Sequence, residues 1–220
     1  MTEDQAREEI CRVGKSLFER GYVHASAGNI SVRHAGGLLI TPTDACLGFL
    51  DPARLSSLDL AGEPAGGDPP SKTAALHRRI YQAARRADPH TGCVIHTHGS
   101  HCVALSLTAS GAELLAPLTP YFVMKVGHVP LIPYDRPGAP ASADRVEQAI
   151  ARYEQGGTPI RAVMLERLGP IVWHDTPAAA MATLEELEET ARLCLLGGAQ
   201  AAPLAENAID ELRRVFGARW

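Results

Sequence analysis

An apolar run that ends in a pair of histidines is the part of this chain best suited to chemistry. Residues 93–101 read CVIHTHGSH, with His96 and His98 two positions apart. Side chains alternate along a β-strand, so this spacing points both imidazoles to one face. Histidine is the commonest protein ligand of transition metals, and a divalent ion there could stabilise an enolate. The pair predicts half of a metal site, and two hydrogen-bonded surface histidines are the alternative.

Three short polar segments could bind an anion. The loop from Ser26 to Asn29 is small and contains glycine, which exposes backbone N–H groups of the kind that bind phosphate. Residues 41–43 add two threonine hydroxyls. Ser71 and Lys72 stand at the start of a predicted helix, where the helix dipole and the lysine charge both favour an anion. Each segment alone also fits an ordinary turn or helix cap, but together they favour a phosphate site.

The elements that must position these groups follow from hydrophobic periodicity. Helical spacing of apolar residues predicts helices over 2–20, 71–86, 142–155, 176–197 and 207–216. Alternating or apolar runs predict strands over 30–33, 38–41, 93–98, 123–134, 162–165 and 170–173, with a Gly/Pro-rich loop over 61–70. Helices and strands intermix along the chain, and hairpins occur among the strands. The pattern predicts an α/β domain over residues 1–220, with a mixed or mostly antiparallel sheet covered by helices.

Composition excludes several classes of function. The chain has 220 residues and a formal net charge of -4 without a long basic run, so it lacks the electrostatic signature of nucleic-acid binding. No apolar stretch approaches the length of a membrane span. The five cysteines are scattered without a C-x-x-C motif, and the acidic N-terminus does not read as a signal peptide. A cytoplasmic protein with reduced thiols is expected.

Several segments in order resemble the class II aldolase/adducin family, whose founding enzyme is L-fuculose-phosphate aldolase. The resemblance is carried by AGNISVR at 27–33, LITPT at 39–43 and HTH at 96–98. Within the family, the chain is most similar to the 3-oxo-tetronate 4-phosphate decarboxylase branch. The segments that carry this second resemblance are PSK at 70–72, LTPYFVM at 118–124, PLIPY at 130–134 and EELEETA at 185–191.

This resemblance implies a three-layer α/β/α domain around a mostly antiparallel sheet, assembled as a homotetramer with active sites at subunit interfaces. It implies a metal-dependent lyase, either a decarboxylase or an aldolase, that breaks a carbon–carbon bond of a small phosphorylated sugar acid or ketose through an enediolate. It implies that His96 and His98 bind Zn²⁺ or another divalent metal, and that Tyr121 is a catalytic proton donor reaching an adjacent subunit. The residues implied to bind phosphate are Gly28, Asn29, Thr43, Ser71 and Lys72.

Two positions depart from the family pattern. The acid/base glutamate of the family is replaced by Thr73, four residues before His77, and its third zinc histidine is replaced by Leu168. Threonine has no useful acidity at neutral pH, and leucine has no lone pair. Asp44 is a smaller departure, because its carboxylate would repel a phosphate unless it faces away. The residues that could replace the missing metal ligand are His77, His101, His128 and Glu166.

The departures leave three kinds of function open. Decarboxylation of a β-keto acid needs an electron sink more than it needs a base, so loss of the glutamate harms a decarboxylase less than an aldolase. A family member that kept the fold but lost catalysis is the second possibility. A Schiff-base enzyme using Lys72 or Lys125 is the third. Lys125 lies in an apolar run where desolvation would favour the neutral amine, although a lysine with its charge in solvent fits the same pattern.

Overall fold

One eight-stranded sheet organises the chain, with the strand order β4-β3-β2-β1-β5-β8-β7-β6. The computed structural model describes residues 1–198 and 201–220. The strands are β1 Asn29–His34, β2 Gly37–Ile40, β3 Ser56–Leu58, β4 Pro64–Gly66, β5 Cys93–His96, β6 Leu131–Ile132, β7 Ala162–Leu165 and β8 Gly169–His174. Every neighbouring pair is antiparallel except β6 and β7, which run parallel. The prediction of a mostly antiparallel sheet is confirmed.

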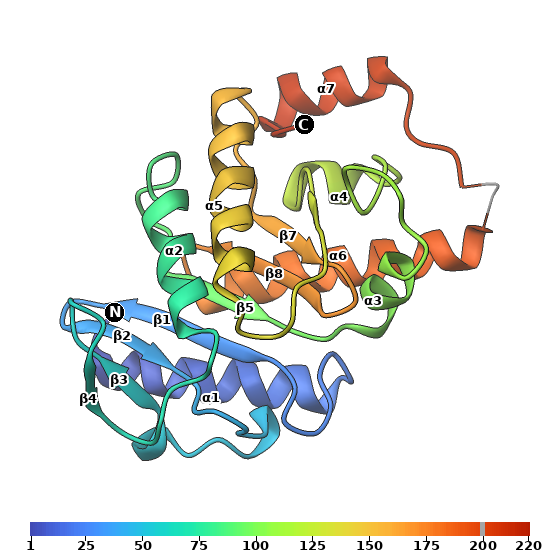
Figure 1. The fold of residues 1–220 in the computed structure, drawn as a ribbon. Coiled ribbons are helices and arrows are strands. Elements are labelled where there is room, and N and C mark those ends of the chain that lie inside the picture. The colour runs from blue at the N-terminus through green and yellow to red at the C-terminus, as the bar shows by residue number, and fades with distance from the viewer. Residues whose placement is uncertain (199–200) are drawn as a thin grey trace.

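Helices cover both faces of this sheet (Figure 1). One face is covered by α1 Glu3–Glu19, α3 Ser100–Ser106, α4 Pro120–Lys125 and α6 Pro177–Gly197. The other face is covered by α2 Ala74–Ala84 and α5 Pro140–Gln155. The last helix, α7 Glu206–Phe216, packs on α4, and two short 3₁₀ turns, Leu47–Phe49 and Pro52–Arg54, lie between β2 and β3. The three-layer α/β/α architecture predicted from the resemblance is confirmed.

The central strand β5 divides its side chains between two hydrophobic cores. Cys93 and Ile95 pack into the core shared with α1 and α6, whereas Val94 packs into the core shared with α2 and α5. Because side chains alternate along a strand, His96 lies on the same face as Val94. The first histidine of the pair therefore faces the layer formed by α2 and α5.

The ends of the longest helices are set by local sequence. Thr2 and Gln5 form the predicted capping box of α1, in which each side chain bonds the backbone of the other. Thr176 caps α6 by accepting a hydrogen bond from the N–H of Ala179, and Pro177 occupies the first helical turn. These caps orient the two helices that bury the apolar face of the sheet.

Four predicted elements are wrong in detail. The strand expected over 93–98 ends at His96, so His98 follows the strand. The strand expected over 123–134 is instead α4 followed by the two-residue strand β6, because Thr119 caps a helix that has Pro120 in its first turn. Gly127 then breaks the chain direction with φ +78°. The helix expected from Ser71 begins at Ala74, since the N–H of Ala74 closes a turn on the Ser71 carbonyl. The loop expected over 61–70 contains the edge strand β4.

Two further observations bear on the class of protein. Within the described residues, no helix is both long and apolar enough to cross a lipid bilayer. All five cysteines are free thiols.

Candidate active site

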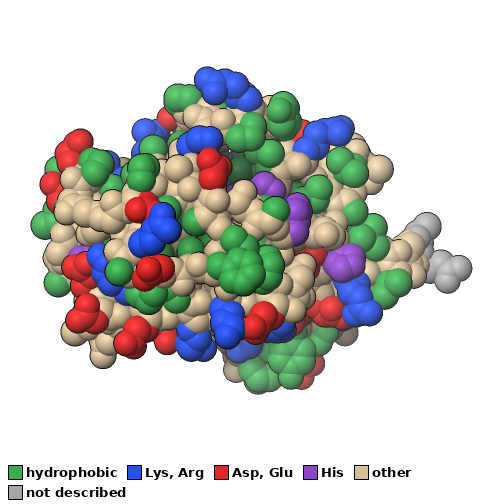
Figure 2. Space-filling view, turned by 90° about the horizontal axis from the view of Figure 1, so that it is seen from below, with side chains coloured by type: hydrophobic (Ala, Val, Ile, Leu, Met, Phe, Trp, Pro, Cys, Tyr) green, Lys and Arg blue, Asp and Glu red, His purple; other side chains and the backbone are tan. Residues whose placement is uncertain are grey.

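A cavity of about 410 Å³ lies where α2, α5 and the end of β5 meet. It is lined by every residue predicted to bind phosphate and by both histidines of the pair: Gly28, Asn29, Thr43, Ser71, Lys72, His96 and His98. Figure 2 shows histidine side chains bordering a hollow on the face seen from below. Segments separated by up to seventy positions in the sequence are thus brought to one place, in a volume that suits a small-molecule ligand.

The pairing of β1 with β5 explains how the two groups of residues meet. Asn29, the first residue of β1, lies directly opposite His96, the last residue of β5. Cross-strand partners point to the same face, with Cβ atoms about 4.5–5.5 Å apart. Gly28 allows the close approach, because its φ is +84° and a Cβ there would lie 2.8 Å from the His96 carbonyl oxygen. The anion-binding loop is therefore fixed against the histidine segment by the sheet itself.

The two imidazoles lie close together at the end of β5. Their ring centroids are 5.0 Å apart, close to the roughly 5 Å expected for two imidazoles on one tetrahedral zinc. The Nδ1 atom of His96 lies 2.9 Å from the Pro170 carbonyl. Because a carbonyl only accepts, Nδ1–H donates, and Nε2 is left free to bind a metal.

Burial keeps both imidazoles in the neutral form that binds metals. Desolvation lowers the pKa of His96 to about 4, with His98 adding repulsion and the Pro170 hydrogen bond opposing the shift. The pKa of His98 is also lowered, first by partial burial and then by His24. Both rings are consequently uncharged at neutral pH.

The third ligand position of the family is occupied by hydrocarbon. Leu168 lines the cavity with the two histidines. The turn between β7 and β8 packs directly on the histidine segment, since a Cβ on Gly169 would lie 2.0 Å from the Thr97 carbonyl oxygen. In the part of the chain that the structure describes, no three His, Cys, Asp or Glu side chains converge as metal ligands. The donor set therefore fits a divalent metal with two protein ligands and does not complete a three-ligand centre.

None of the four possible replacement donors lines the cavity. His77, on the buried side of α2, has its Nδ1 2.8 Å from the Ser31 hydroxyl, and burial lowers its pKa to about 3, with His96 contributing to the shift. His101 is held 2.9 Å from Glu188 on α6. Both histidines therefore contact residues outside the cavity.

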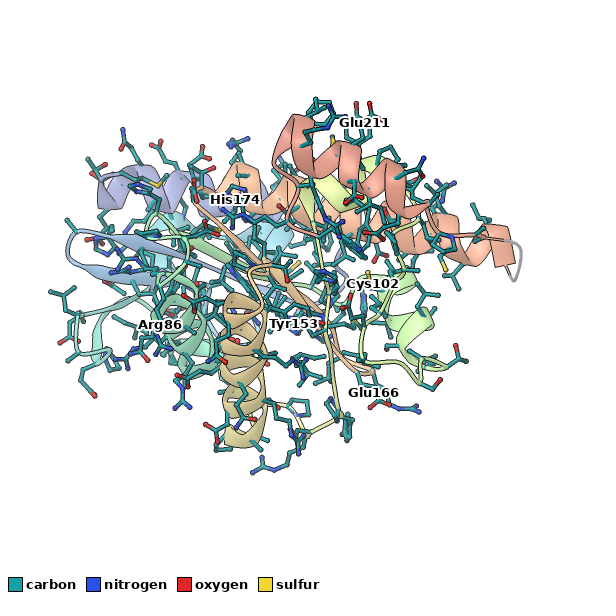
Figure 3. The ribbon with its side chains drawn as sticks, turned by 90° about the horizontal axis from the view of Figure 1, so that it is seen from above. Arg86, Cys102, Tyr153, Glu166, His174 and Glu211 are labelled. Carbon is teal, nitrogen blue, oxygen red and sulfur yellow. The ribbon has the colours of Figure 1, made fainter. Side chains whose placement is uncertain are left out.

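The other two candidates are also engaged away from the cavity. His128 lies 2.9 Å from Glu113 and stacks on Trp220, with ring centroids 4.2 Å apart. Glu166, at the turn between β7 and β8 (Figure 3), accepts a hydrogen bond of 3.1 Å from the N–H of Tyr134. None of these four residues is placed in the structure to replace the missing ligand.

The position of the missing acid/base group holds a hydroxyl. Thr73 lines the cavity, and its Oγ1 lies 3.0 Å from the Ser71 hydroxyl. Thr73 precedes α2 without capping it by its side chain. The N–H of Ala74 bonds the Ser71 carbonyl, which leaves the N–H groups of Ala75 and Leu76 open to a ligand. Asp44 is exposed at the cavity edge with a φ of +56°.

Tyr121 is placed away from the cavity of its own chain. It lies in the first turn of α4 and is 60% exposed. Lys125, at the end of the same helix, is exposed and also outside the cavity. The desolvation that a Schiff-base role of Lys125 would need is absent there.

Sequence reasoning missed two arginines at the site. Arg136 lines the cavity from the Pro/Gly-rich loop before α5. Arg79 also lines it and joins α2 to α5 through ion pairs of 2.5 Å with Asp144 and 2.7 Å with Glu147. The sequence could have indicated Arg136, because this arginine is followed by Pro137 and Gly138 just before a helix. No local pattern pointed to Arg79, because its partners lie on another helix.

Known proteins with similar sequences and structures identify the family of this chain. Residues 8–195 match the Class II Aldolase and Adducin N-terminal domain family. The chain is 51% identical to the 3-oxo-tetronate 4-phosphate decarboxylase of Cupriavidus necator over 100% of this chain and 99% of that protein. It is 40% identical to the Escherichia coli enzyme of the same name, over 96% of each chain. The crystal structure of YgbL from Escherichia coli superposes with a TM-score of 0.86 at 38% identity, covering 96% of this chain and 99% of that one. This chain belongs to the class II aldolase and adducin family.

Proposed function

We propose that the protein is a lyase that removes carbon dioxide from a small 3-oxo sugar acid carrying a phosphate at carbon 4. The observation that carries this proposal is the shared cavity, in which a pair of neutral imidazoles adjoins an anion-binding loop. Relatives that align along nearly the whole chain are 3-oxo-tetronate 4-phosphate decarboxylases, which supports the same substrate class for this protein.

The phosphate end of the substrate is assigned to the loop before β1 and to the start of α2. Lys72 provides a positive charge that forms no ion pair with any described residue. The open N–H groups at the start of α2 favour an anion in the same place. Asn29 is only 7% exposed and lines the cavity, and its side-chain NH₂ can donate a hydrogen bond to a phosphate oxygen. Gly28, Thr43 and Ser71 complete this cradle.

The carboxylate end of the substrate is assigned to Arg136. Its guanidinium belongs to a different element from Lys72, and it forms no ion pair with any described residue. Arginine suits a carboxylate because its planar fork of donors matches both oxygens. A substrate with an anionic group at each end therefore has a cationic residue for each.

The reaction needs an electron sink and one proton. The bond between the carboxylate carbon and its neighbour breaks, carbon dioxide leaves, and the electron pair moves onto the carbonyl oxygen to give an enediolate. Protonation at carbon then yields a three-carbon ketose phosphate. His96 and His98 would hold a divalent metal such as zinc, which when bound would supply the positive charge that an enediolate needs.

The residue at position 73 favours decarboxylation over aldol cleavage. Aldol cleavage requires a base to remove a hydroxyl proton, and Thr73 cannot serve as one. Decarboxylation releases carbon dioxide without removing that proton. The replacement of the family glutamate is therefore tolerated by this reaction and not by the other.

Tyr121 is proposed to deliver the proton to the enediolate carbon of an adjacent subunit in a homotetramer. Its 60% exposure on α4, outside the cavity of its own chain, supports a role across an interface. A cytoplasmic location is proposed from the five unpaired cysteines.

Carbon dioxide release from the 3-oxo acid phosphate, generated in situ, tests the proposal. The wild-type protein with added Zn²⁺, Co²⁺ or Mn²⁺ should release carbon dioxide, and His96→Ala should not. His90→Ala, a change at an exposed histidine outside the cavity, is the matched control. Cleavage of a ketose phosphate to an aldehyde would instead show an aldolase. Binding of the phosphate without turnover of either substrate would show a family member that has lost catalysis.

A further inference from the structure

We infer that this site binds its divalent metal jointly with the substrate: His96 and His98 are the only protein ligands, and substrate oxygens take the place left by Leu168. The inference rests on the proposed function and goes beyond it, because it assigns the site an order and a coupling of binding. It follows from a disagreement between the donors present and the usual three protein ligands of a catalytic zinc.

The vacated position cannot hold a metal through the protein. Leu168 has no donor atom, and its side chain packs against the core that also contains Ile171 and Trp173. It also lines the cavity beside the two imidazoles, so an apolar wall stands where a ligand would be needed.

His24 is another imidazole close to the pair. Its ring centroid lies 6.4 Å from that of His98, whereas the centroids of His96 and His98 are 5.0 Å apart. It belongs to the turn that ends with the Ala27 N–H bonding the His24 carbonyl, and it is exposed. As it stands, His24 is about 1.4 Å too distant to share a metal in the way that the pair does.

The substrate is positioned to supply the missing donors. The strand register fixes Asn29 of the phosphate cradle opposite His96. A phosphate held there places the adjoining carbonyl and hydroxyl oxygens of the same small molecule beside the imidazoles. A carbonyl and a neighbouring hydroxyl form a chelating pair, and oxygen donors are acceptable to zinc. Two imidazoles and two substrate oxygens make a four-coordinate set.

This arrangement couples the two binding equilibria. If the ligand increases the affinity of the protein for metal by some factor, the metal must increase the affinity for the ligand by the same factor. The free protein should bind metal weakly, and the complex should bind it at least about tenfold more tightly, which is the scale on which even supporting partners of metal ligands act.

Metal titrations of the intact, chelator-treated protein test the coupling. The probes are Zn²⁺ and Co²⁺, competed against a coloured chelator, with and without the reduced form of the substrate. That 3-hydroxy acid 4-phosphate keeps the phosphate and the vicinal oxygens but cannot lose carbon dioxide. A titration of the ligand with metal and chelator alone corrects for chelation in solution.

Wild-type protein is expected to gain at least about tenfold in metal affinity when the reduced substrate is present. Leu168→His is expected to bind metal tightly without ligand and to gain less than about threefold from it, because its third ligand is already present. Leu168→Cys tests the same point with a smaller donor if the histidine variant folds poorly. His96→Ala should bind no metal under either condition.

Two results would overturn the inference. One is a wild-type metal affinity that the ligand leaves unchanged. The other is a tenfold or greater loss of metal affinity in ligand-free His24→Ala, which would identify a third protein donor. Carbon dioxide release measured with excess metal separates this inference from the proposed function. Release without coupling removes the inference alone, and coupling without release removes the proposed function alone.

Discussion

Lowering the pH should destabilise the fold through His77, a residue of α2 whose side chain is buried against the sheet. This side chain is 0% exposed. Its Nδ1 lies 2.8 Å from the Ser31 hydroxyl, and its Nε2 has no hydrogen-bond partner. Desolvation, with a smaller effect of His96, lowers the pKa of His77 to about 3 from the ordinary 6.5. The charged form is thus strongly disfavoured in the folded protein and not in the unfolded one.

The direction and size of this pH effect on the free energy of unfolding follow from proton linkage. The folded pKa is below the unfolded one, so the unfolded chain binds more protons as the pH falls below about 6.5. The stability that His77 contributes is complete above that pH and is lost as the pH approaches 3. Between pH 7 and pH 5, the shift corresponds to a loss of about 2 kcal/mol in the free energy of unfolding from this group.

His77→Asn isolates the contribution. Asparagine cannot titrate, but it keeps a polar atom for the bond to Ser31. The smaller side chain should cost about 1–3 kcal/mol at pH 7. Urea unfolding at pH 7, 6 and 5, with chelator present, should show the variant losing about 2 kcal/mol less than wild type over that range. His90→Asn, an exposed histidine, is the control. Equal losses in wild type and His77→Asn would refute the reasoning.

Three further predictions concern the cavity. Lys72→Ala should raise the KM for the phosphorylated substrate by about 10–100-fold, the scale of a charged hydrogen bond, and leave binding of an unphosphorylated analogue unchanged; equal effects on both would remove phosphate from its role. Arg136→Ala should raise the KM for the 3-oxo acid phosphate and leave inorganic phosphate binding unchanged in calorimetry, whereas loss of phosphate binding would reassign the residue. Gly28→Ala should lower the unfolding midpoint and the kcat together, because its Cβ would meet the His96 carbonyl oxygen at 2.8 Å; an unchanged midpoint would show that the loop moves freely.

Local motifs allowed much of the site to be predicted from the sequence. The run that ends at His96 and His98 and the small loop at Gly28 and Asn29 carry their signals within a few residues. Both segments were expected to bind ligands, and both line one cavity. The α/β/α layers were also predicted, and they are confirmed by the sheet order and by the helices on its two faces.

What could not be predicted depends on contacts between distant segments. The register that sets Asn29 against His96 is fixed by strand pairing across more than sixty residues, and no local pattern encodes it. Arg79 reaches the site through ion pairs with another helix. The segment of α4 looked like a strand because its apolar residues are consecutive. The cap at Thr119 and Pro120 decided in favour of a helix.

At position 168 the family resemblance does not predict the metal site of this chain. The family pattern predicts three zinc histidines, and the sequence alone shows Leu168 in the third place. The four other residues that could replace the missing ligand contact Ser31, Glu188, Glu113 and the Tyr134 backbone instead. These hydrogen bonds depend on how distant segments pack together, and the spacing of residues in the sequence does not predict them.

A crystal grown with Zn²⁺ and the reduced substrate tests the central claim most directly, through an anomalous difference map at the zinc edge. The account predicts one peak between His96 and His98, in contact with ligand oxygens, with the phosphate against Asn29 and Lys72. A map with no peak between these two rings, or a zinc bound by other residues while the ligand occupies the cavity, would contradict it.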